Sequence, residues 1–492
     1  MKALLIYPET PQTFWSFHWA LDFISKKAAL PPLGLVTLAA MLPENWDKKI
    51  VDLNVEKLTD EDLTWANMIF LSGMNVHTAS IHRIVARCKD HKKTVVGGGP
   101  VFTLDWESFP EIDHFVLNEA EETLPFFLED LEKGTLKKLY QCDTYPDISG
   151  TPVPRWNLLK LNRYASLSIQ YSRGCPFDCE FCSITMLNGR TPRMKTSDRF
   201  LKELQCMYDL GWRGDVFIVD DNIAGNRRRL KQDLLPALIT WLENRDYPFA
   251  FTTEISIDTS DDEELVDLLA RANITHVFVG IETPDTESLT ECGKRQNCNR
   301  DLVGSVRKFQ NSGISVSGGF IVGFDHDGPS IFRKQIDFIQ KSGIVTAMVG
   351  LLNAPLGTKL HKRLATEKRI VKTMSGDNMD GSLNFIPKMD KEILVSGYKK
   401  ILSTIYAPSF YYKRLRTFVR EFKPRISMRK RVSSGEIKAL FKALWRCGIR
   451  GKEKIPFWGT LVWGLFRQPS KLDVIVRMAV YGFHFRKVAE TV

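Results

Sequence analysis

Three cysteines stand close together in the spacing C-x3-C-x2-C: Cys175, Cys179 and Cys182. Three thiolates in one short loop can hold three corners of a four-iron cluster and leave the fourth iron open to a further ligand, whereas an electron-transfer cluster normally takes four cysteines. Neighbouring Gly174 and Pro176 are typical of an exposed turn rather than a buried core. The loop is therefore predicted to bind an iron–sulfur cluster that takes part in chemistry.

Two other uses of these cysteines are weaker. A zinc site of the Cys3His type would need a distant ligand, because no histidine lies between His114 and His276. A disulfide framework is disfavoured, since 9 cysteines in 492 residues are too sparse for a secreted, cross-linked fold. We expect reduced thiols and a cytoplasmic location.

The loop, with Phe181 directly before its third cysteine, resembles that of the radical S-adenosylmethionine (AdoMet) enzymes. The resemblance implies a [4Fe-4S] cluster whose open iron chelates the amino and carboxylate groups of AdoMet. It also implies that one electron cleaves AdoMet to a 5′-deoxyadenosyl radical, with Phe181 among the AdoMet contacts. A reductant such as flavodoxin or ferredoxin would supply that electron.

Residues 160–360 alternate short apolar segments with amphipathic ones, which predicts a partial (β/α)6 barrel with its site at the carboxyl ends of the strands. The predicted strands are 164–170, 215–219, 249–255, 276–281, 315–322 and 345–351.

Acidic residues follow several of these strands. Carboxylates suit the ammonium and ribose hydroxyls of AdoMet, and Asp221, Glu254 and Glu282 stand at the ends of the second, third and fourth strands. The family resemblance implies that Glu254 contacts the amino-acid or ribose part of AdoMet and that Glu282 belongs to a glycine-rich motif beside it. Each acid could instead be a solvated loop carboxylate.

Residues 1–145 alternate strands and helices in a way that predicts a Rossmann-like, doubly wound parallel sheet. Strands are expected at 2–7, 49–53, 68–72, 93–97 and 114–117, with helices at 33–42 and 79–88. Ligands of such sheets bind beyond the carboxyl ends of the strands. Two of these ends carry the small residues Ser72-Gly73 and Gly97-Gly98-Gly99, which let a ligand approach the backbone.

This N-terminal half resembles the cobalamin-binding domain of one class of radical AdoMet proteins. The matching pieces are Pro31 to Leu35, Ser72-Gly73-Met74, Gly97 to Pro100 and the turn at Glu119. The resemblance implies that Ser72, Gly73, Gly97, Gly98, Gly99 and Glu119 contact cobalamin. The D-x-H-x-x-G signature of a cobalt-ligating histidine is missing, so histidine-off binding is implied. The alternative is a Rossmann-like domain that binds nothing.

Positive charge is concentrated in the last part of the chain. The net charge is +10, and residues 408–492 hold 20 Lys and Arg against 5 Asp and Glu. Region 361–492 is predicted to be mainly helical, with a capping box at Ser433 to Glu436 followed by a basic amphipathic helix. Such a helix can lie on an anionic membrane at the inner face, pack on the barrel, or bind a partner. A nucleic-acid partner is not expected, because no known module is present.

No secretory signal and no transmembrane segment are expected, since the longest uncharged apolar run, 455–466, is too short to span a bilayer. Segments 384–389 and 405–412 resemble the C-terminal region of a subgroup that includes hopanoid C-2 methylases. The resemblance implies cobalamin-dependent methylation of an unactivated carbon in a hydrophobic small molecule, with lipids among the candidates. Radical oxidation, cyclisation or rearrangement without methyl transfer is the first alternative, and a non-enzymatic cobalamin or iron–sulfur sensor is the second.

Overall fold

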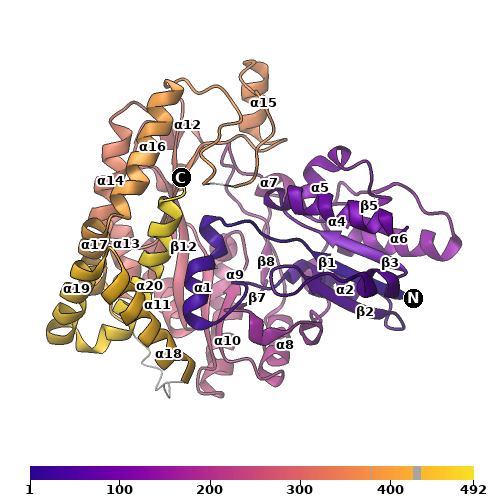
Figure 1. Ribbon diagram of the computed structural model, residues 1–492, viewed down its shortest axis with the longest axis horizontal. Coiled ribbons are helices and arrows are strands. Elements are labelled where there is room, and N and C mark those ends of the chain that lie inside the picture. The colour runs from indigo at the N-terminus through magenta and orange to yellow at the C-terminus, as the bar shows by residue number, and fades with distance from the viewer. Residues whose placement is uncertain (378, 425–433) are drawn as a thin grey trace.

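The protein is described by a computed structural model that covers residues 1–377, 379–424 and 434–492. Two six-stranded parallel sheets lie side by side, and helices of the C-terminal region cover the side of the second sheet away from the first (Figure 1). The α/β class with a helical C-terminal region is the one that the sequence predicts. The predicted boundaries between the three regions stay a prediction.

The N-terminal sheet has the order β2-β1-β3-β4-β5-β6, and all pairs are parallel. Its strands are β1 (Lys2–Tyr7), β2 (Asp47–Asp52), β3 (Met68–Ser72), β4 (Thr94–Gly98), β5 (His114–Val116) and β6 (Leu139–Tyr140). The first five were predicted to within two residues. Strand β6 was missed, because two residues are too few to show an alternating pattern.

Helices cover both faces of this sheet, since alternate residues of each strand point to opposite sides. Leu4 and Ile6 share one core with α3 (Asp60–Trp65), α4 (Thr78–Asp90) and α5 (Pro100–Asp105). Ala3 and Leu5 share the other with α2 (Leu33–Met41) and α6 (Ala120–Lys133). This second core continues into that of the barrel, so the two sheets are packed together by buried apolar side chains.

The second sheet has the order β14-β13-β12-β11-β10-β7 and is also parallel throughout. Strands β7 and β14 are its two edges, so it forms a partial barrel. The strands are β7 (Leu167–Ile169), β10 (Gly214–Ile218), β11 (Phe249–Glu254), β12 (Ile274–Glu282), β13 (Ser315–Val322) and β14 (Ala347–Leu351). The helices between them are α8 (Ser197–Asp209), α9 (Arg227–Arg229), α10 (Leu235–Glu243), α11 (Glu263–Arg271), α12 (Thr286–Glu291), α13 (Leu302–Asn311) and α14 (Ile331–Ser342).

The barrel has a packed outer face and a partly exposed inner face. Phe249 stacks on Trp241 of α10 with ring centroids 5.6 Å apart, so this side of β11 faces the helices. Thr252 and Glu254 therefore face inward, and both are half-buried. Because Glu254 pairs with Phe278 in the β11–β12 register, Phe278 shares that inner face.

The predicted strand 164–170 is shorter than expected, because β7 ends at Ile169. The carboxylate of Asp220 accepts hydrogen bonds from the backbone N–H groups of Tyr171 (2.8 Å) and Ser172 (2.7 Å), which takes these donors away from the sheet ladder. The chain then enters a small antiparallel ribbon of β8 (Ser172–Arg173) and β9 (Arg193–Met194). The cysteine loop and α7 (Ile184–Leu187) lie between these two strands.

The C-terminal region is helical, as predicted. Helices α16 (Lys391–Ile405) and α17 (Pro408–Glu421) pack on α14, and α15 (Lys359–Thr366) lies near the cysteine loop. The predicted basic helix is observed as α18 (Ser434–Ala443) and a π-helical turn, η11 (Leu444–Arg450), followed by α19 (Lys454–Arg467) and α20 (Leu472–Ala489). The predicted capping box depends on Ser433 and on side chains outside the described residues. Within the described ranges, no helix has the length and apolar character needed to cross a membrane.

Candidate functional site

The cysteine loop is held at the carboxyl end of the barrel by backbone hydrogen bonds. Cys175 N–H donates to the carbonyl of Gly189 at 3.2 Å, and Cys182 N–H donates to that of Cys179 at 3.1 Å. Glu180 between them bridges two distant segments, since its N–H donates to the Cys292 carbonyl and its carbonyl accepts from Leu360 N–H, both at 2.9 Å. The loop is thus fixed by residues more than 100 positions away.

Gly174 sets the direction of the chain into the loop. Its φ of +94° lies in the left-handed region, which side chains disfavour. A Cβ at this position would also lie 2.9 Å from the carbonyl oxygens of Asn188 and Thr191 and 3.0 Å from that of Gly189. The residue before Cys175 therefore has to be glycine for this loop to form.

Among the three cysteines of the loop, Cys179 is buried, while Cys175 and Cys182 are half-buried. Burial raises the pKa of all three, to about 12 for Cys182, while the nearby ammonium of Lys294 acts in the opposite direction on each. In the described part of the chain, no group of three or more His, Cys, Asp or Glu side chains is placed to hold a metal ion. This finding concerns a single ion, whereas each thiolate of a four-iron cluster binds a different iron, so the three cysteines of one loop still supply the sulfur donors that such a cluster takes.

Lys294 is a site residue that sequence reasoning missed. Its Nζ donates to Glu282 Oε1 at 2.7 Å, and the two side chains are only 14% and 8% exposed. Glu282 ends β12 with a φ of +61°, which is uncommon for a side chain other than glycine. The carboxylate predicted to lie beside AdoMet thus holds a lysine against the cysteines. Nothing in the local sequence distinguishes Lys294 from an ordinary loop lysine.

Glu254 has a different environment, because its half-buried carboxylate forms no hydrogen bond or ion pair with any described residue. Burial, and next the negative charge of Asp221, raise its pKa to about 8. Asp221 is instead tied to the cysteine loop: it accepts hydrogen bonds from Asn188 Nδ2 (3.0 Å) and Gly174 N–H (3.3 Å). A carboxylate without a partner can receive an ammonium or hydroxyl group from a ligand.

Phe181 is half-buried, and its ring lies 6.3 Å from that of Phe324, centroid to centroid. Phe324 follows β13, so Phe181 joins the cysteine loop to the end of a barrel strand. The preceding residue adds a second link, because the Glu180 carboxylate accepts from Arg363 of α15 at 2.6 Å.

The small residues predicted to face cobalamin form one edge of the N-terminal sheet. Ser72 of β3 pairs with Gly98 of β4, and both are half-buried where the rest of their strands is almost entirely buried. Gly99 has a φ of +92°, and a Cβ there would overlap the Ser72 hydroxyl oxygen. The adjacent residues Gly73 and Gly97 are buried. The strand order reverses between β1 and β3, so a ligand crevice is expected beside β3. The exposed backbone of this edge fits a large planar ligand.

Glu119 has another set of partners. It accepts hydrogen bonds from Arg173 Nη1 (2.6 Å) and from Arg193 Nη1 (2.9 Å) and Nη2 (2.5 Å), and its side chain is 8% exposed. Arg173 stands two residues before Cys175. The residue predicted to contact cobalamin therefore joins the end of the N-terminal sheet to both strands of the ribbon that carries the cysteine loop.

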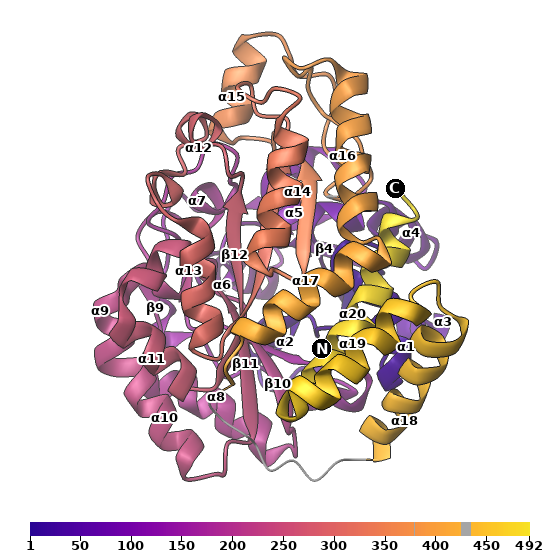
Figure 2. The same ribbon diagram turned by 90° about the vertical axis from the view of Figure 1, so that its left-hand side faces the viewer.

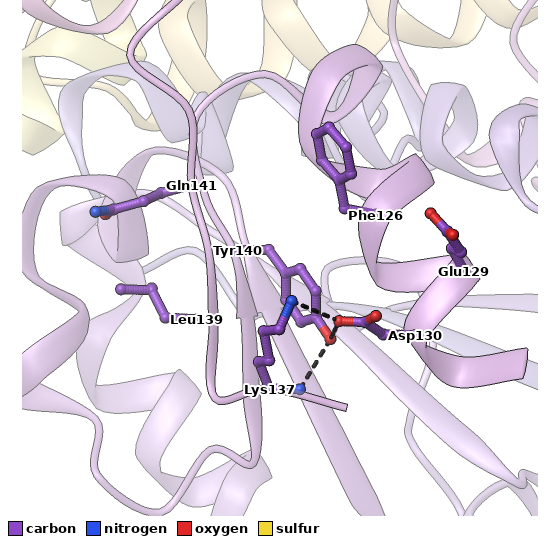
Figure 3. A pocket seen from close by; sticks show the side chains of 7 residues that line it. All are labelled: Phe126, Glu129, Asp130, Lys137, Leu139, Tyr140 and Gln141. Atoms are coloured by element: carbon purple, nitrogen blue, oxygen red, sulfur yellow. Dashed lines mark hydrogen bonds and ion pairs between the residues drawn. The ribbon is translucent and has the colours of Figure 1, made fainter. Parts of the chain in front are cut away.

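A surface depression of about 420 Å³ lies apart from these residues, between α6 and the edge strand β6 (Figure 3). In it, the Tyr140 hydroxyl donates to Asp130 Oδ2 at 3.0 Å and accepts from Lys137 N–H at 2.8 Å. The depression is open and none of the predicted site residues lines it, so we do not assign the chemistry to it.

Comparison with known proteins decides the family. Three family models match successive parts of the chain: a B12 binding domain at residues 23–128, the radical SAM superfamily at 169–339 and a domain of unknown function (DUF4070) at 358–492. An uncharacterized methyltransferase of Synechocystis sp. is 38% identical and covers 100% of this chain and 92% of its own. The hopanoid C-2 methylase of Rhodopseudomonas palustris is 31% identical over 93% of this chain and 88% of its own. The chain belongs to the cobalamin-binding radical AdoMet enzymes.

A solved structure supports the fold of this radical AdoMet enzyme. The methyltransferase TsrM from Kitasatospora setae, with cobalamin and a [4Fe-4S] cluster bound, aligns with a TM-score of 0.64 over 97% of this chain and 98% of that one, at 15% identity. The family membership makes the chain an enzyme that uses AdoMet, a [4Fe-4S] cluster and cobalamin, and its full-length relatives place it with the methyltransferases. These cofactor predictions are confirmed. The residues that contact each cofactor stay predictions.

Proposed function

We propose that this enzyme methylates an unactivated carbon of a hydrophobic small molecule, and that the molecule is a lipid. The contact between Glu119 and Arg173 carries the proposal. It joins the carboxyl edge of the N-terminal sheet to the segment that enters the cysteine loop, so that cobalamin and AdoMet bound at these two edges would face one space. Methyl transfer to a carbon requires both cofactors at one substrate.

In the proposed site, Cys175, Cys179 and Cys182 hold the cluster. Glu254, which is half-buried and has no partner in the described part of the chain, receives a polar group of AdoMet. Phe181 and Asp221 support the loop, and Glu282 holds Lys294 near the thiols, where the lysine offsets their negative charge. When bound, the cluster supplies the electron that cleaves AdoMet, and cobalamin carries the methyl group. A flavodoxin- or ferredoxin-type protein would supply that electron.

Ser72, Gly73, Gly97, Gly98 and Gly99 would line the cobalamin side, where the absence of long side chains leaves backbone for contact. Glu119 is proposed to act there indirectly. Because both of its oxygens are already engaged by arginines, it positions the sheet edge relative to the cysteine loop.

A hydrophobic substrate is supported by one relative and by an exposed apolar surface. The hopanoid C-2 methylase spans nearly the whole chain at 31% identity. One side of α18–η11 and one side of α19 expose large apolar side chains, here called the tail face: Ile437, Leu440, Phe441, Trp445, Ile449, Ile455, Trp458, Val462, Leu465 and Phe466. Trp458 Nε1 donates to the Gly448 carbonyl at 2.8 Å, which brings the two helical segments together.

The tail face fits an anionic membrane better than a protein partner of neutral charge. Exposed apolar patches of this extent on soluble domains usually mark interaction sites. The same segments carry the basic residues Lys438, Lys442, Arg446, Arg450, Lys452, Lys454 and Arg467, of which Lys442 and Arg446 contact Asp22 of α1. Each basic residue near an anionic bilayer contributes about 1 kcal/mol. We propose peripheral attachment through this face, which would bring the enzyme to a membrane-resident substrate.

Anaerobic turnover tests the proposed function. Protein reconstituted with iron, sulfide and cobalamin is given a reductant, a hopanoid in detergent micelles, and AdoMet with a deuterated methyl group. We expect 5′-deoxyadenosine and a product heavier by one labelled methyl group, and neither from the Cys175→Ala variant. Loss of AdoMet cleavage in the wild-type enzyme would contradict the radical mechanism.

The second candidate is radical oxidation or cyclisation without methyl transfer. A relative named anaerobic magnesium-protoporphyrin IX monomethyl ester cyclase, from Synechocystis sp., is 24% identical over 63% of this chain and favours it. In the same experiment, 5′-deoxyadenosine together with an altered but unlabelled product would identify this chemistry.

A further inference from the structure

The segment between β1 and α2 leaves the N-terminal sheet and crosses to the barrel. Its helix α1 (His18–Ile24) packs on α20 and α18, far from the sheet to which its neighbours in sequence belong (Figures 1 and 2). Just before α1, Phe14 stacks on Phe485 of α20 with ring centroids 4.3 Å apart, and Phe17 stacks on His484 at 5.4 Å. The backbone on both sides of Trp15 is therefore anchored.

Trp15 faces the other way, toward the strands of the barrel. Its ring lies edge-to-face with that of Phe278 on β12, at 5.4 Å between centroids and 82° between planes. Its indole N–H donates to the sulfur of Met348 on β14 at 3.1 Å. A tryptophan from the N-terminal segment thus lies across two strands of the barrel. We call Trp15, Phe278 and Met348 the Trp15 platform.

The platform lies next to the proposed AdoMet site. Phe278 is the register partner of Glu254 on the inner face, and the Ile255 N–H donates to the Phe278 carbonyl at 3.0 Å. Only one strand spacing, about 5 Å, separates neighbouring strands in a sheet. A molecule resting on Phe278 would therefore be adjacent to the carboxylate proposed to hold AdoMet.

Trp15 is fixed in place yet leaves much of its surface uncovered. Its side chain is 37% exposed, while the adjacent Phe14 is 1% exposed, and Phe278 and Met348 are half-buried. A tryptophan that serves only to fill a core is covered by its neighbours, as Trp156 is. A rigid aromatic surface binds apolar ligands well, because little side-chain entropy is lost on contact.

We propose that the Trp15 platform binds the apolar ring skeleton of the substrate and holds it beside the AdoMet site. The proposal rests on the proposed function and assigns the position of its substrate. It also gives a role to the crossing segment: the N-terminal half supplies part of the substrate site in the barrel.

Substrate binding and AdoMet cleavage are measured separately on the cofactor-loaded enzyme. The variants are Trp15→Ala and Trp15→Phe. Phe126→Ala is the matched control, because Phe126 is an exposed aromatic residue on α6, which packs on the N-terminal sheet. The probe is a radiolabelled hopanoid in detergent micelles, followed by equilibrium binding. The second readout is 5′-deoxyadenosine formed without hopanoid, together with the absorbance of bound cobalamin.

Loss of an aromatic contact of this type predicts about tenfold weaker hopanoid binding for Trp15→Ala. Trp15→Phe should stay within about threefold of wild type, and both variants should keep substrate-free AdoMet cleavage. If Trp15→Ala bound the hopanoid with wild-type affinity, the platform proposal would be overturned, whereas the proposed function would stand. Equal loss of binding and cleavage in both variants would overturn it too, since Trp15 would then serve folding. A wild-type enzyme that cleaves AdoMet but neither binds nor methylates the hopanoid would overturn both the lipid proposal and the platform.

Discussion

Individual side chains around the cysteine loop have requirements that a neighbouring residue type would not meet. Gly174 combines a left-handed backbone with three carbonyl oxygens in contact distance of any added Cβ. Glu254 and Glu282 are both acids at strand ends, yet Glu254 has no partner among the described residues, whereas Glu282 holds Lys294. Chemically similar residues therefore have different roles, which their surroundings decide.

Gly174→Ala is expected to prevent assembly of the cluster site. The new Cβ would clash with backbone oxygens that cannot move independently, so the loop would have to shift. We expect iron content after anaerobic reconstitution to fall at least severalfold. Gly211→Ala is the control, because Gly211 has a φ of +83° but no atom within 4 Å of its Cβ position. Normal iron loading in Gly174→Ala would show that the loop tolerates the shift.

Glu254 should give the cofactor-free protein a characteristic pH dependence. Its pKa is about 8 in the folded protein against an ordinary value of 4.5, so the folded state keeps a proton that the unfolded state releases between these values. The free energy of unfolding therefore falls as the pH rises through this window. In Glu254→Gln, this decrease of the free energy of unfolding with pH should be absent, so the variant should be more stable than wild type above about pH 8.

Thermal melting of wild type and Glu254→Gln from about pH 5 to about pH 9 measures how the stability of each protein changes with pH. Glu132→Gln, an exposed position on α6, should keep the wild-type slope. If Glu254→Gln also showed the wild-type pH dependence, the Glu254 carboxylate would be better hydrated than its surroundings indicate.

At the scale of elements, the β8–β9 ribbon connects the two halves of the site. Each of its strands carries one arginine that binds Glu119, which follows β5 of the other sheet. Arg173 also pairs with Glu121 at 2.9 Å. The geometry between the sheet edge and the cysteine loop thus depends on a few buried ion pairs.

Glu119→Gln should weaken this connection strongly. Removing one partner of a buried ion pair leaves uncompensated charge and typically costs about 3–5 kcal/mol. We expect a loss of about 3 kcal/mol in the free energy of unfolding, measured with urea. Glu122→Gln is the matched control, since Glu122 lies one turn along the same helix and forms no ion pair with a described residue. An unchanged midpoint for Glu119→Gln would mean that water replaces the carboxylate.

At the scale of the whole molecule, the N-terminal segment and the C-terminal helices pack together. Residues 8–32 run from the N-terminal sheet to the barrel, and the C-terminal helices return to cover α1 (Figure 2). The helices that pack on α1 belong to the same basic region that exposes the tail face. The proposed membrane surface is therefore connected to the segment that carries Trp15.

Membrane attachment predicts that charge introduced on the tail face will reduce liposome binding. The pair Phe441→Asp with Phe466→Asp removes two of its most exposed aromatic residues, which are 66% and 78% exposed. We expect at least tenfold weaker co-sedimentation with vesicles of anionic phospholipid, and weaker wild-type binding at high salt. Phe126→Asp, 58% exposed on α6, should bind like wild type. Equal binding by all three proteins would contradict the assignment.

Local sequence patterns were sufficient for several features of this protein. The cysteine spacing predicted an iron–sulfur cluster, and the short apolar strands with intervening helices predicted both sheets, because these signals lie within a few consecutive residues. The sequence also marked the small-residue ends of β3 and β4, which the folded sheet brings together because Ser72 pairs with Gly98.

Contacts between distant residues came only from the folded chain. Lys294 donates to Glu282, Glu119 accepts from Arg173, and Trp15 donates to Met348 across 333 positions. None of these pairs has a periodicity or a motif, since each depends on how complete elements pack. Residue types and spacing therefore predicted the cofactors, whereas tertiary packing decided which charges are paired and which carboxylate lacks a partner among the described residues.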